Sequence, residues 1–207
     1  MRLGCFILMW LWGNLKAQQD IHLKWNFHST DPYLNIDVCK FYVGNFVFYN
    51  HGIEVGRAED YFLMERLKRE ELIFHECINT GFDAFEFQLG VDSITHERGV
   101  MMGDLDPVQN MYWTWQAGYI DAKIEGKWKE HPFQLHLGGY QHPYRADQKV
   151  RVSCSKVQYE YQFDSFLDIG FIQRLNEAMG DNGCLIMSPR TEAVEWMQWI
   201  ANKMMEH

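Results

Sequence analysis

The chain has 207 residues and a formal net charge of −9, which opposes nonspecific binding to nucleic acid. Lysine and arginine form no cluster that could follow a phosphate backbone, and 47% of the residues are hydrophobic, which excludes a disordered chain. This length allows one domain with a substantial core. We therefore expect a folded acidic domain with no nucleic-acid partner.

Residues 1–17 are typical of a secretory signal peptide. Arg2 precedes an apolar stretch, and residues 15–17 resemble a small-residue cleavage site. The stretch is too short to span a bilayer as a helix, so we expect no stable membrane span after cleavage. Removal of Arg2 and Lys16 takes the charge from −9 to −11. We expect the mature protein to be a single domain, residues 18–207, in the periplasm or secreted.

Apolar and polar residues alternate along most of the mature chain, which predicts half-buried β-strands. Turn signals such as Asn50-His51-Gly52 separate these segments. Several short strands between turn signals are typical of an antiparallel β-sandwich, and we expect this mainly β fold over residues 21–163. The predicted strands cover residues 21–27, 40–49, 85–91, 133–137 and 150–163.

Between the third and fourth of these strands lies a dense aromatic stretch, Tyr112 to Tyr119, which follows a tight turn at 103–107. A strand is expected to continue from it to Ile124. Because strand side chains alternate, we expect Trp113 and Trp115 to share one face, with Tyr112 and Thr114 on the other. Such a pair is either a core anchor or a redox-active or ligand-facing surface.

The period of the pattern changes near the C-terminus. Apolar residues recur at helical spacing, which predicts an amphipathic helix over residues 190–205 that packs on the sandwich. Ser188 is expected to be the N-cap, with Pro189 at the first helical position. A second short helix is expected over residues 171–179.

Export would place the cysteines of the mature chain in an oxidising compartment. Four cysteines permit two disulfides in three pairings, and buried free thiols are the alternative. They form no C-x-x-C pair, so zinc or thioredoxin-like chemistry is not indicated. The four residues are Cys39, Cys77, Cys154 and Cys184.

Histidines and methionines are the candidate copper ligands, because copper favours imidazole and soft sulfur. His136 lies on the strand face opposite Leu135 and Leu137, just before Gly138-Gly139, and His28 closes the first strand. Hydrogen-bonded structural histidines are the alternative. Thioether candidates, which are also ordinary core residues, are Met101, Met102, Met111 and Met187.

Three aspartates are candidate calcium ligands. Asp104 and Asp106 flank Leu105 in the tight turn, and Asp92 follows a predicted strand. Alternate aspartates in a loop can bind calcium through oxygen atoms, but the same Asp-x-Asp-Pro pattern forms an ordinary Asx turn.

Five motifs together resemble the core signature of the MbnP-like family, which comprises copper-associated secreted or periplasmic bacterial proteins. The resemblance extends over about residues 20–205. The motifs are Gly-Val-Asp-Ser at 90–93, Leu-Asp-Pro at 105–107, Met-Tyr-Trp-Thr-Trp-Gln-Ala-Gly-Tyr-Ile at 111–120, Lys-Ile-Glu-Gly at 123–126 and His-Leu-Gly-Gly at 136–139.

This resemblance implies a copper-binding function and a diheme MbnH-like partner. Some relatives carry a tryptophan that such a partner oxidises to kynurenine, which helps to form the copper site. Trp113 and Trp115 are the matching positions here, and His136 matches the histidine of the family's H-x-G-G motif. In one branch a histidine lies close in sequence to the modified tryptophan, whereas no histidine occurs here between His96 and His131.

Three functions follow as hypotheses. The first is an exported copper-binding protein for copper acquisition or storage, with a diheme partner. The second is a structural or interaction module of the same fold that binds no metal. The third is a carbohydrate-binding sandwich with exposed tryptophans. The sequence has no G-x-S-x-G, P-loop or G-x-G-x-x-G motif, so it does not indicate an enzyme.

Overall fold

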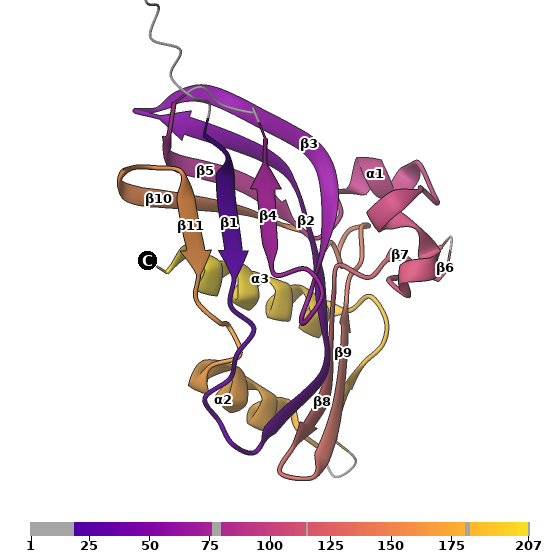
Figure 1. The fold of residues 1–207 in the computed structure, drawn as a ribbon. Coiled ribbons are helices and arrows are strands. Elements are labelled where there is room, and N and C mark those ends of the chain that lie inside the picture. Colours follow the sequence, from indigo (N-terminus) through magenta and orange to yellow (C-terminus); the bar gives the residue numbers. More distant parts are fainter. Residues whose placement is uncertain (1–18, 76–79, 115, 181–182, 207) are drawn as a thin grey trace, which may run out of the picture.

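The computed structural model describes residues 19–75, 80–114, 116–180 and 183–206. The predicted signal peptide at 1–17, Cys77 and Trp115 lie outside these residues. Two sheets face one another (Figure 1). The small sheet has the order β11 (Glu160–Phe163), β1 (Ile21–Trp25) and β4 (Glu71–Phe74). The large sheet runs β10 (Gln148–Gln158), β5 (Phe82–Leu89), β2 (Leu34–Asn50), β8 (Ala122–Trp128), β9 (His131–Leu137) and β12 (Cys184–Ile186), and β3 (Ile53–Glu65) also pairs with β2.

The long strand β2 organises the large sheet. Its first part, Leu34 to Phe41, pairs antiparallel with β8, and its second part, Val43 to Tyr49, pairs antiparallel with β5. β3 returns along β2 through a hairpin at His51-Gly52, where both residues have positive φ. β2 therefore carries the pairing from one half of the sheet to the other.

The main core lies between the two sheets and is rich in aromatic rings. Trp25 of β1 stacks on Phe163 of β11, with ring centroids 4.7 Å apart and planes 13° from parallel. Edge-to-face contacts join Trp25 to Phe87, and Phe46 stacks on Phe87 from β2. All four side chains are buried, so the alternation seen in the sequence corresponds to inward-facing residues of both sheets.

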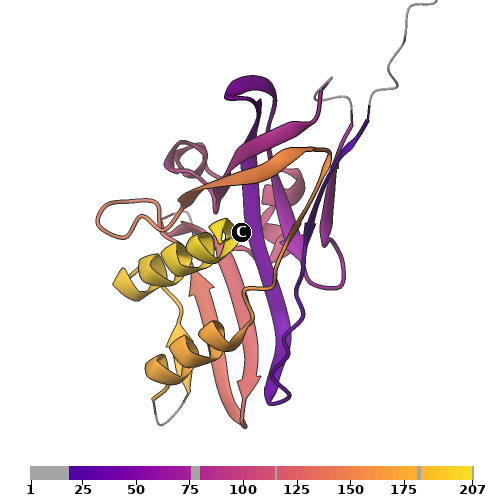
Figure 2. The ribbon, with the colours of Figure 1, turned by 90° about the vertical axis from the view of Figure 1, so that its left-hand side faces the viewer.

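Two helices cover the same face of the large sheet, beside the small sheet (Figure 2). They are α2 (Ile169–Ala178) and α3 (Thr191–Met205), joined through contacts between Phe171 and Trp196. Both helices match the predicted segments. The predicted N-cap at Ser188 is wrong: α3 begins at Thr191, and Arg190 is the N-cap residue without a side-chain hydrogen bond.

The prediction of a mainly β sandwich with a C-terminal helix is confirmed, with two differences in topology. β1 pairs in parallel with β11, and β12 pairs in parallel with β9. The single strand predicted at 150–163 is two strands, β10 in the large sheet and β11 in the small one. The chain changes sheets between Gln158 and Glu160, a switch that alternation in one strand does not report.

A second, smaller cluster lies on the opposite face of the large sheet. Tyr42 and Leu63 belong to it, whereas their neighbours in β2 and β3 enter the main core. The chain between β5 and β8, residues 90–121, covers this face, and we call it the excursion (Figure 1). Its elements are α1 (Ser93–Glu97), η1 (Gly103–Leu105), η2 (Pro107–Gln109), β6 (Tyr112–Thr114) and β7 (Gly118–Tyr119). The strand expected to run on to Ile124 is therefore β6, β7 and β8.

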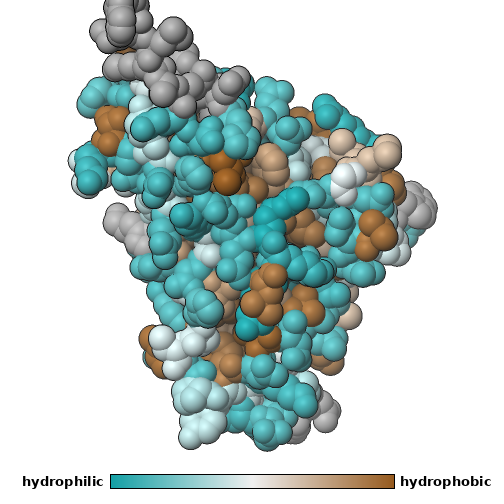
Figure 3. Space-filling view, viewed as in Figure 1, coloured by the Kyte–Doolittle hydropathy of each residue, from teal (hydrophilic) through white to brown (hydrophobic). Residues whose placement is uncertain are grey.

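The face of the molecule viewed in Figure 3 is mostly hydrophilic, with hydrophobic side chains in small separate groups. Within the described ranges, no helix is both long and apolar enough to cross a membrane.

We expect Phe163→Ala to lower the free energy of unfolding by about 3–5 kcal/mol, because it removes a fully buried ring and leaves a cavity against Trp25. Leu185→Ala, at a side chain in β12 that is 56% exposed, is the control and should change it by less than about 0.5 kcal/mol. Urea unfolding measures both. Equal effects would contradict a core centred on Phe163.

Candidate functional site

His96 and Asp121 form a buried polar pair within the excursion, where its two ends leave and rejoin the large sheet. His96 Nε2 lies 3.7 Å from Asp121 Oδ1, and both side chains have no exposed area. His96 Nδ1 accepts the backbone N–H of Tyr119 at 3.1 Å, and Asp121 Oδ1 accepts the N–H of Val91 at 2.8 Å. The pair therefore connects α1, β7 and the segments that leave β5 and enter β8.

Glycines allow this close approach. Gly118 has φ +76°, and a Cβ there would overlap His96 Nδ1. Gly90 has φ +87°, and a Cβ there would come within 2.8 Å of Asp121 Cγ. Both conformations are costly for any residue with a side chain. The glycines of two sequence motifs are thus explained by the space that the His96–Asp121 pair occupies.

The electrostatics of the pair are dominated by burial. Burial raises the pKa of Asp121 to about 6, against the hydrogen bond and charge of His96, which lower it. The atoms His96 Nε2 and Asp121 Oδ2 have no hydrogen-bond partner in the part of the chain that the structure describes. A buried carboxylate with an open oxygen is costly in its charged form.

The aromatic hairpin formed by β6 and β7 packs beside this pair. Tyr112 pairs with Tyr119 and Thr114 with Gly118, so Trp113 is the extra residue of a β-bulge. Tyr112 and Trp113 both pack against the second cluster, which departs from the alternation that we expected. The shared face of Trp113 and Trp115 stays a prediction, because Trp115 lies outside the described residues.

Trp113 lies over the start of the segment that follows β9. A Cβ added to Gly138 would be 3.2 Å from Cζ3 of the Trp113 indole. The Nε1 of Trp113 is buried and has no hydrogen-bond partner among the described residues. The side chain is only partly buried, and it rests on the second cluster, not on an open stacking surface such as a carbohydrate-binding module needs.

His136 of β9 points to the same face of the large sheet as Gly138, two residues further on. It is buried, and its Nε2 lies 2.6 Å from Oε1 of Glu125 on β8. Burial raises the pKa of Glu125, but the His136 hydrogen bond and the Lys123 charge outweigh it, so this pKa is lowered. The imidazole therefore has a carboxylate partner already in place.

His28 lies elsewhere. It follows β1 in the loop to β2, is exposed, and lines a separate pocket with Trp25, Glu70 and Glu71. No residue of β9 lines that pocket. Over the described ranges, no three or more His, Cys, Asp or Glu side chains are grouped so that they could hold a metal ion. The structure therefore does not bring His28 and His136 into one ligand group.

The carboxylates of the three candidate calcium ligands each already accept hydrogen bonds from other groups of the protein. Asp92 caps α1 through Thr95 N–H and accepts the Tyr61 hydroxyl at 2.5 Å. Asp104 accepts the N–H of Leu63 and pairs with Arg69, and Asp106 caps η2. Asp92 and Asp104 line one pocket of about 420 Å³ with Met101 and Met102. These bonds supply the turn and cap roles, and calcium binding stays a prediction.

Cys39, Cys154 and Cys184 are free thiols in the structure. Burial raises the pKa of Cys39 and Cys184, and it raises the pKa of Cys154 to about 11. Cys39 and Cys184 therefore match the buried-thiol alternative, whereas Cys154 is a free thiol that is only partly buried. Of the candidate thioethers, Met111 is fully buried, whereas Met102 is 89% exposed and Met187 46% exposed.

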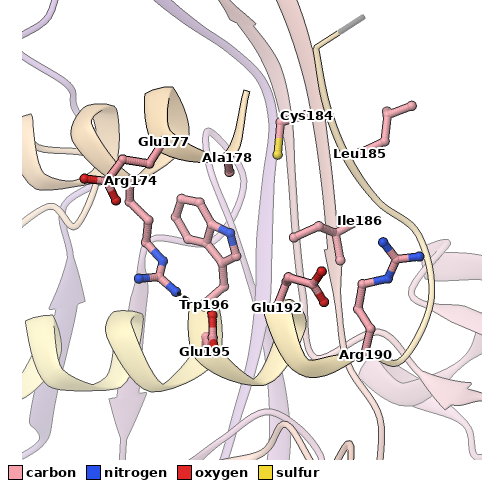
Figure 4. A pocket seen from close by; sticks show the side chains of 10 residues that line it. All are labelled: Arg174, Glu177, Ala178, Cys184, Leu185, Ile186, Arg190, Glu192, Glu195 and Trp196. Atoms are coloured by element: carbon pink, nitrogen blue, oxygen red, sulfur yellow. Dashed lines mark ion pairs between the residues drawn. The ribbon is translucent and has the colours of Figure 1, made fainter. Parts of the chain in front are cut away.

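Another pocket, of about 440 Å³, lies between α2, β12 and the start of α3 (Figure 4). The Arg174 guanidinium lies over the Trp196 ring, 4.9 Å from its centroid, and the sulfur of Cys184 points toward the same space. Arg190 and Glu192 line its other end. Of the predicted copper, calcium and modification residues that the structure describes, none lines it, so this pocket is separate from Trp113 and His136.

A family model described as MbnP matches residues 14–169. The chain belongs to the MbnP family. No curated protein sequence matches it. The structure is similar to that of MbnP from Methylosinus trichosporium, with a TM-score of 0.52 and 12% sequence identity over 85% of this chain and 86% of that one. At this identity, the likeness between this MbnP-family chain and the solved structure shows a common fold.

Sequence reasoning missed His96 and Asp121, although both adjoin motifs of this family. From the sequence, His96 marks only the start of the stretch, up to His131, that contains no histidine. In space it meets the aromatic hairpin directly. Two features of the sequence could have pointed to this pair. One is a lone histidine three residues after Ser93, and the other is an aspartate directly after Tyr119-Ile120, beside apolar residues.

We expect Asp121→Asn to alter the pH dependence of stability. The pKa of Asp121 rises from 3.8 to about 6 on folding, so the native state binds this proton more tightly. Its contribution to stability is then complete below about pH 4 and is lost as the pH rises through 6, by about 3 kcal/mol. As the pH rises from about 4 to about 8, the unfolding free energy of the wild type minus that of the variant should therefore fall by about 3 kcal/mol.

Urea unfolding at about pH 4 and about pH 8 measures this difference. The same substitution at exposed Asp37 controls for the removal of one carboxylate. A difference for Asp121→Asn that stays constant with pH would contradict the raised pKa.

Proposed function

We propose that this MbnP-family protein is exported, binds copper through His136, and carries in Trp113 the target of oxidation by a diheme partner. One observation carries the proposal: the aromatic hairpin and the His-Leu-Gly-Gly motif converge, with Trp113 over Gly138 and His136 two residues away on the same face. These motifs are separated by more than a dozen residues in the sequence. Their meeting at one place supports a common role.

The residues present fit copper in part. His136 supplies an imidazole and Glu125 a carboxylate, and imidazole is a ligand that both copper oxidation states accept. Two donors leave the shell incomplete. A kynurenine at position 113 would add an aromatic amine and a carbonyl oxygen beside Gly138, so oxidation of Trp113 and copper binding belong to one proposal.

The oxidation needs an external oxidant, since no redox group of this chain supplies one. Conversion to kynurenine cleaves the C2–C3 bond of the indole and adds two oxygen atoms, and the formyl carbon then leaves by hydrolysis as formate. The diheme partner would supply the oxidising iron, and peroxide, reduced to water, would supply the electron acceptor. Long-range oxidation requires the indole to lie near the surface that meets the partner. Trp113 is only partly buried, which is compatible with that requirement.

We expect the peptide that contains Trp113 to gain two oxygen atoms and lose one carbon monoxide unit when the protein is made with an active diheme partner, and to stay unmodified without it. Peptide mass spectrometry with fragmentation assigns the change to Trp113 or Trp115. Trp113→Phe and Trp115→Phe are the matched variants. An unmodified peptide beside a partner shown to be active would contradict this part of the proposal.

We expect His136→Ala to lower copper affinity at least tenfold, because it removes the imidazole of an already sparse ligand set. Titration of the modified protein with copper(I) and copper(II) measures this. His51→Ala, at a side chain 82% exposed, is the matched control and should bind as the wild type does. Unchanged binding by His136→Ala would remove this residue from the site.

His28→Ala is tested in the same titration, because the structure places His28 in a different pocket. A loss confined to His28→Ala would assign the copper to that pocket instead. If the wild type binds no copper in either modification state, the metal-free interaction module is the better reading of the fold.

A further inference from the structure

Among the described residues, which leave out Trp115, the aromatic hairpin has few hydrogen bonds of its own. There β6 and β7 pair at two positions, and the bulge at Trp113 lies between them. Other bonds of the hairpin are Ile120 N–H to the Met111 carbonyl at 2.9 Å and Ala117 N–H to the Thr114 hydroxyl at 3.2 Å. A two-stranded ribbon of this length is at best marginally stable alone. Its position must therefore depend on contacts with the rest of the molecule.

His96 supplies such a contact from outside the hairpin. Its Nδ1 accepts the N–H of Tyr119, so a backbone group of β7 is held by a side chain of α1. The imidazole is itself fixed on several sides. It stacks on Tyr140, with centroids 4.7 Å apart and planes 9° from parallel, and it meets the Tyr119 ring edge-on at 5.3 Å. The Asp92 carboxylate caps its helix by accepting the Thr95 N–H at 2.8 Å.

The contact also defines the proton position on the ring. Because Nδ1 accepts a hydrogen bond from a backbone amide, the neutral ring carries its proton on Nε2. That nitrogen faces Asp121 Oδ1 at 3.7 Å, which favours the same tautomer. Gly118, with no Cβ, lets the turn of the hairpin approach Nδ1 closely. The histidine, the aspartate and the glycine are thus mutually consistent.

We propose that His96 is the positioning residue of the aromatic hairpin, and that its Nδ1 holds Trp113 over Gly138 and beside the His136 face. The consequence for tryptophan oxidation and copper rests on the proposed function above, but the positioning itself does not. A purely packing role needs only a side chain of similar volume. A positioning role needs a hydrogen-bond acceptor where Nδ1 lies.

Two amide variants separate these roles. Asn places its side-chain oxygen near the Nδ1 position of histidine, whereas Gln reaches toward the Nε2 position. We expect His96→Asn to retain the hairpin and His96→Gln to release it. Hydrogen exchange of the Tyr119 amide, followed by NMR on the full chain, should be about tenfold faster in His96→Gln, and within about threefold of wild type in His96→Asn. Equal exchange in the two variants would overturn the proposal.

A measurement on the wild type needs no substitution. The imidazole nitrogen shifts of His96 should show a proton on Nε2 and an unprotonated Nδ1. A proton on Nδ1 would overturn the proposal even if neither variant folds, because that nitrogen could then not accept the Tyr119 N–H.

Modification yield with the diheme partner distinguishes this inference from the proposed function. If the wild type is modified, the yield should fall at least tenfold in His96→Gln and recover in His96→Asn. If the wild type is not modified while the exchange pattern holds, the proposed function fails and the positioning role stands. Equal yields in the two variants, with the wild type modified, would overturn the role of His96 in presenting Trp113.

Discussion

Burial of the His96–Asp121 pair is the constraint on which the arrangement of the excursion depends. Neither side chain has any exposed area, so each polar atom must find a partner within the fold or remain costly. The available partners are backbone amides of Val91 and Tyr119, at the start and near the end of the excursion. These two bonds therefore draw both ends of a long connection together, beside the end of β5 and the start of β8.

The second cluster also holds the excursion against the large sheet. Tyr119 stands between the two, since its ring contacts His96, Tyr42 and Tyr112, while its hydroxyl donates to the Gly99 carbonyl and accepts the Met101 N–H. A buried aromatic residue with a satisfied hydroxyl is a rigid support. The face of the sheet that carries His136 is thus partly covered by a connection that has its own small core, and Trp113 lies at the boundary.

Membership of the MbnP family and a shared fold at 12% identity have a common physical basis. A sandwich core requires inward-facing apolar residues of suitable volume, and many combinations meet that need. The motif residues face stricter conditions. Gly90 and Gly118 adjoin the buried pair, and Gly138 lies beneath an indole, so each position rejects a side chain for a reason particular to this site. A common fold at low overall identity is therefore compatible with strict steric conditions at these three glycines.

The sequence by itself determined the fold class, the strands that alternate cleanly and the C-terminal helix, because these depend on the period of apolar residues along a local segment. Only the tertiary structure decided the parallel pairings of β1 and β12 and the split of 150–163 between two sheets, since each depends on a partner strand distant in sequence. The bulge at Trp113 lies in a short local hairpin, and it interrupts an alternation that the sequence pattern alone assumes to be regular. Likewise His136 could be placed on the correct strand face from alternation, but the approach of Trp113 to Gly138 and the burial of His96 beside the hairpin could not be predicted in this way. Local periodicity reports which face a side chain takes, and only the packing of distant segments reports what that face meets.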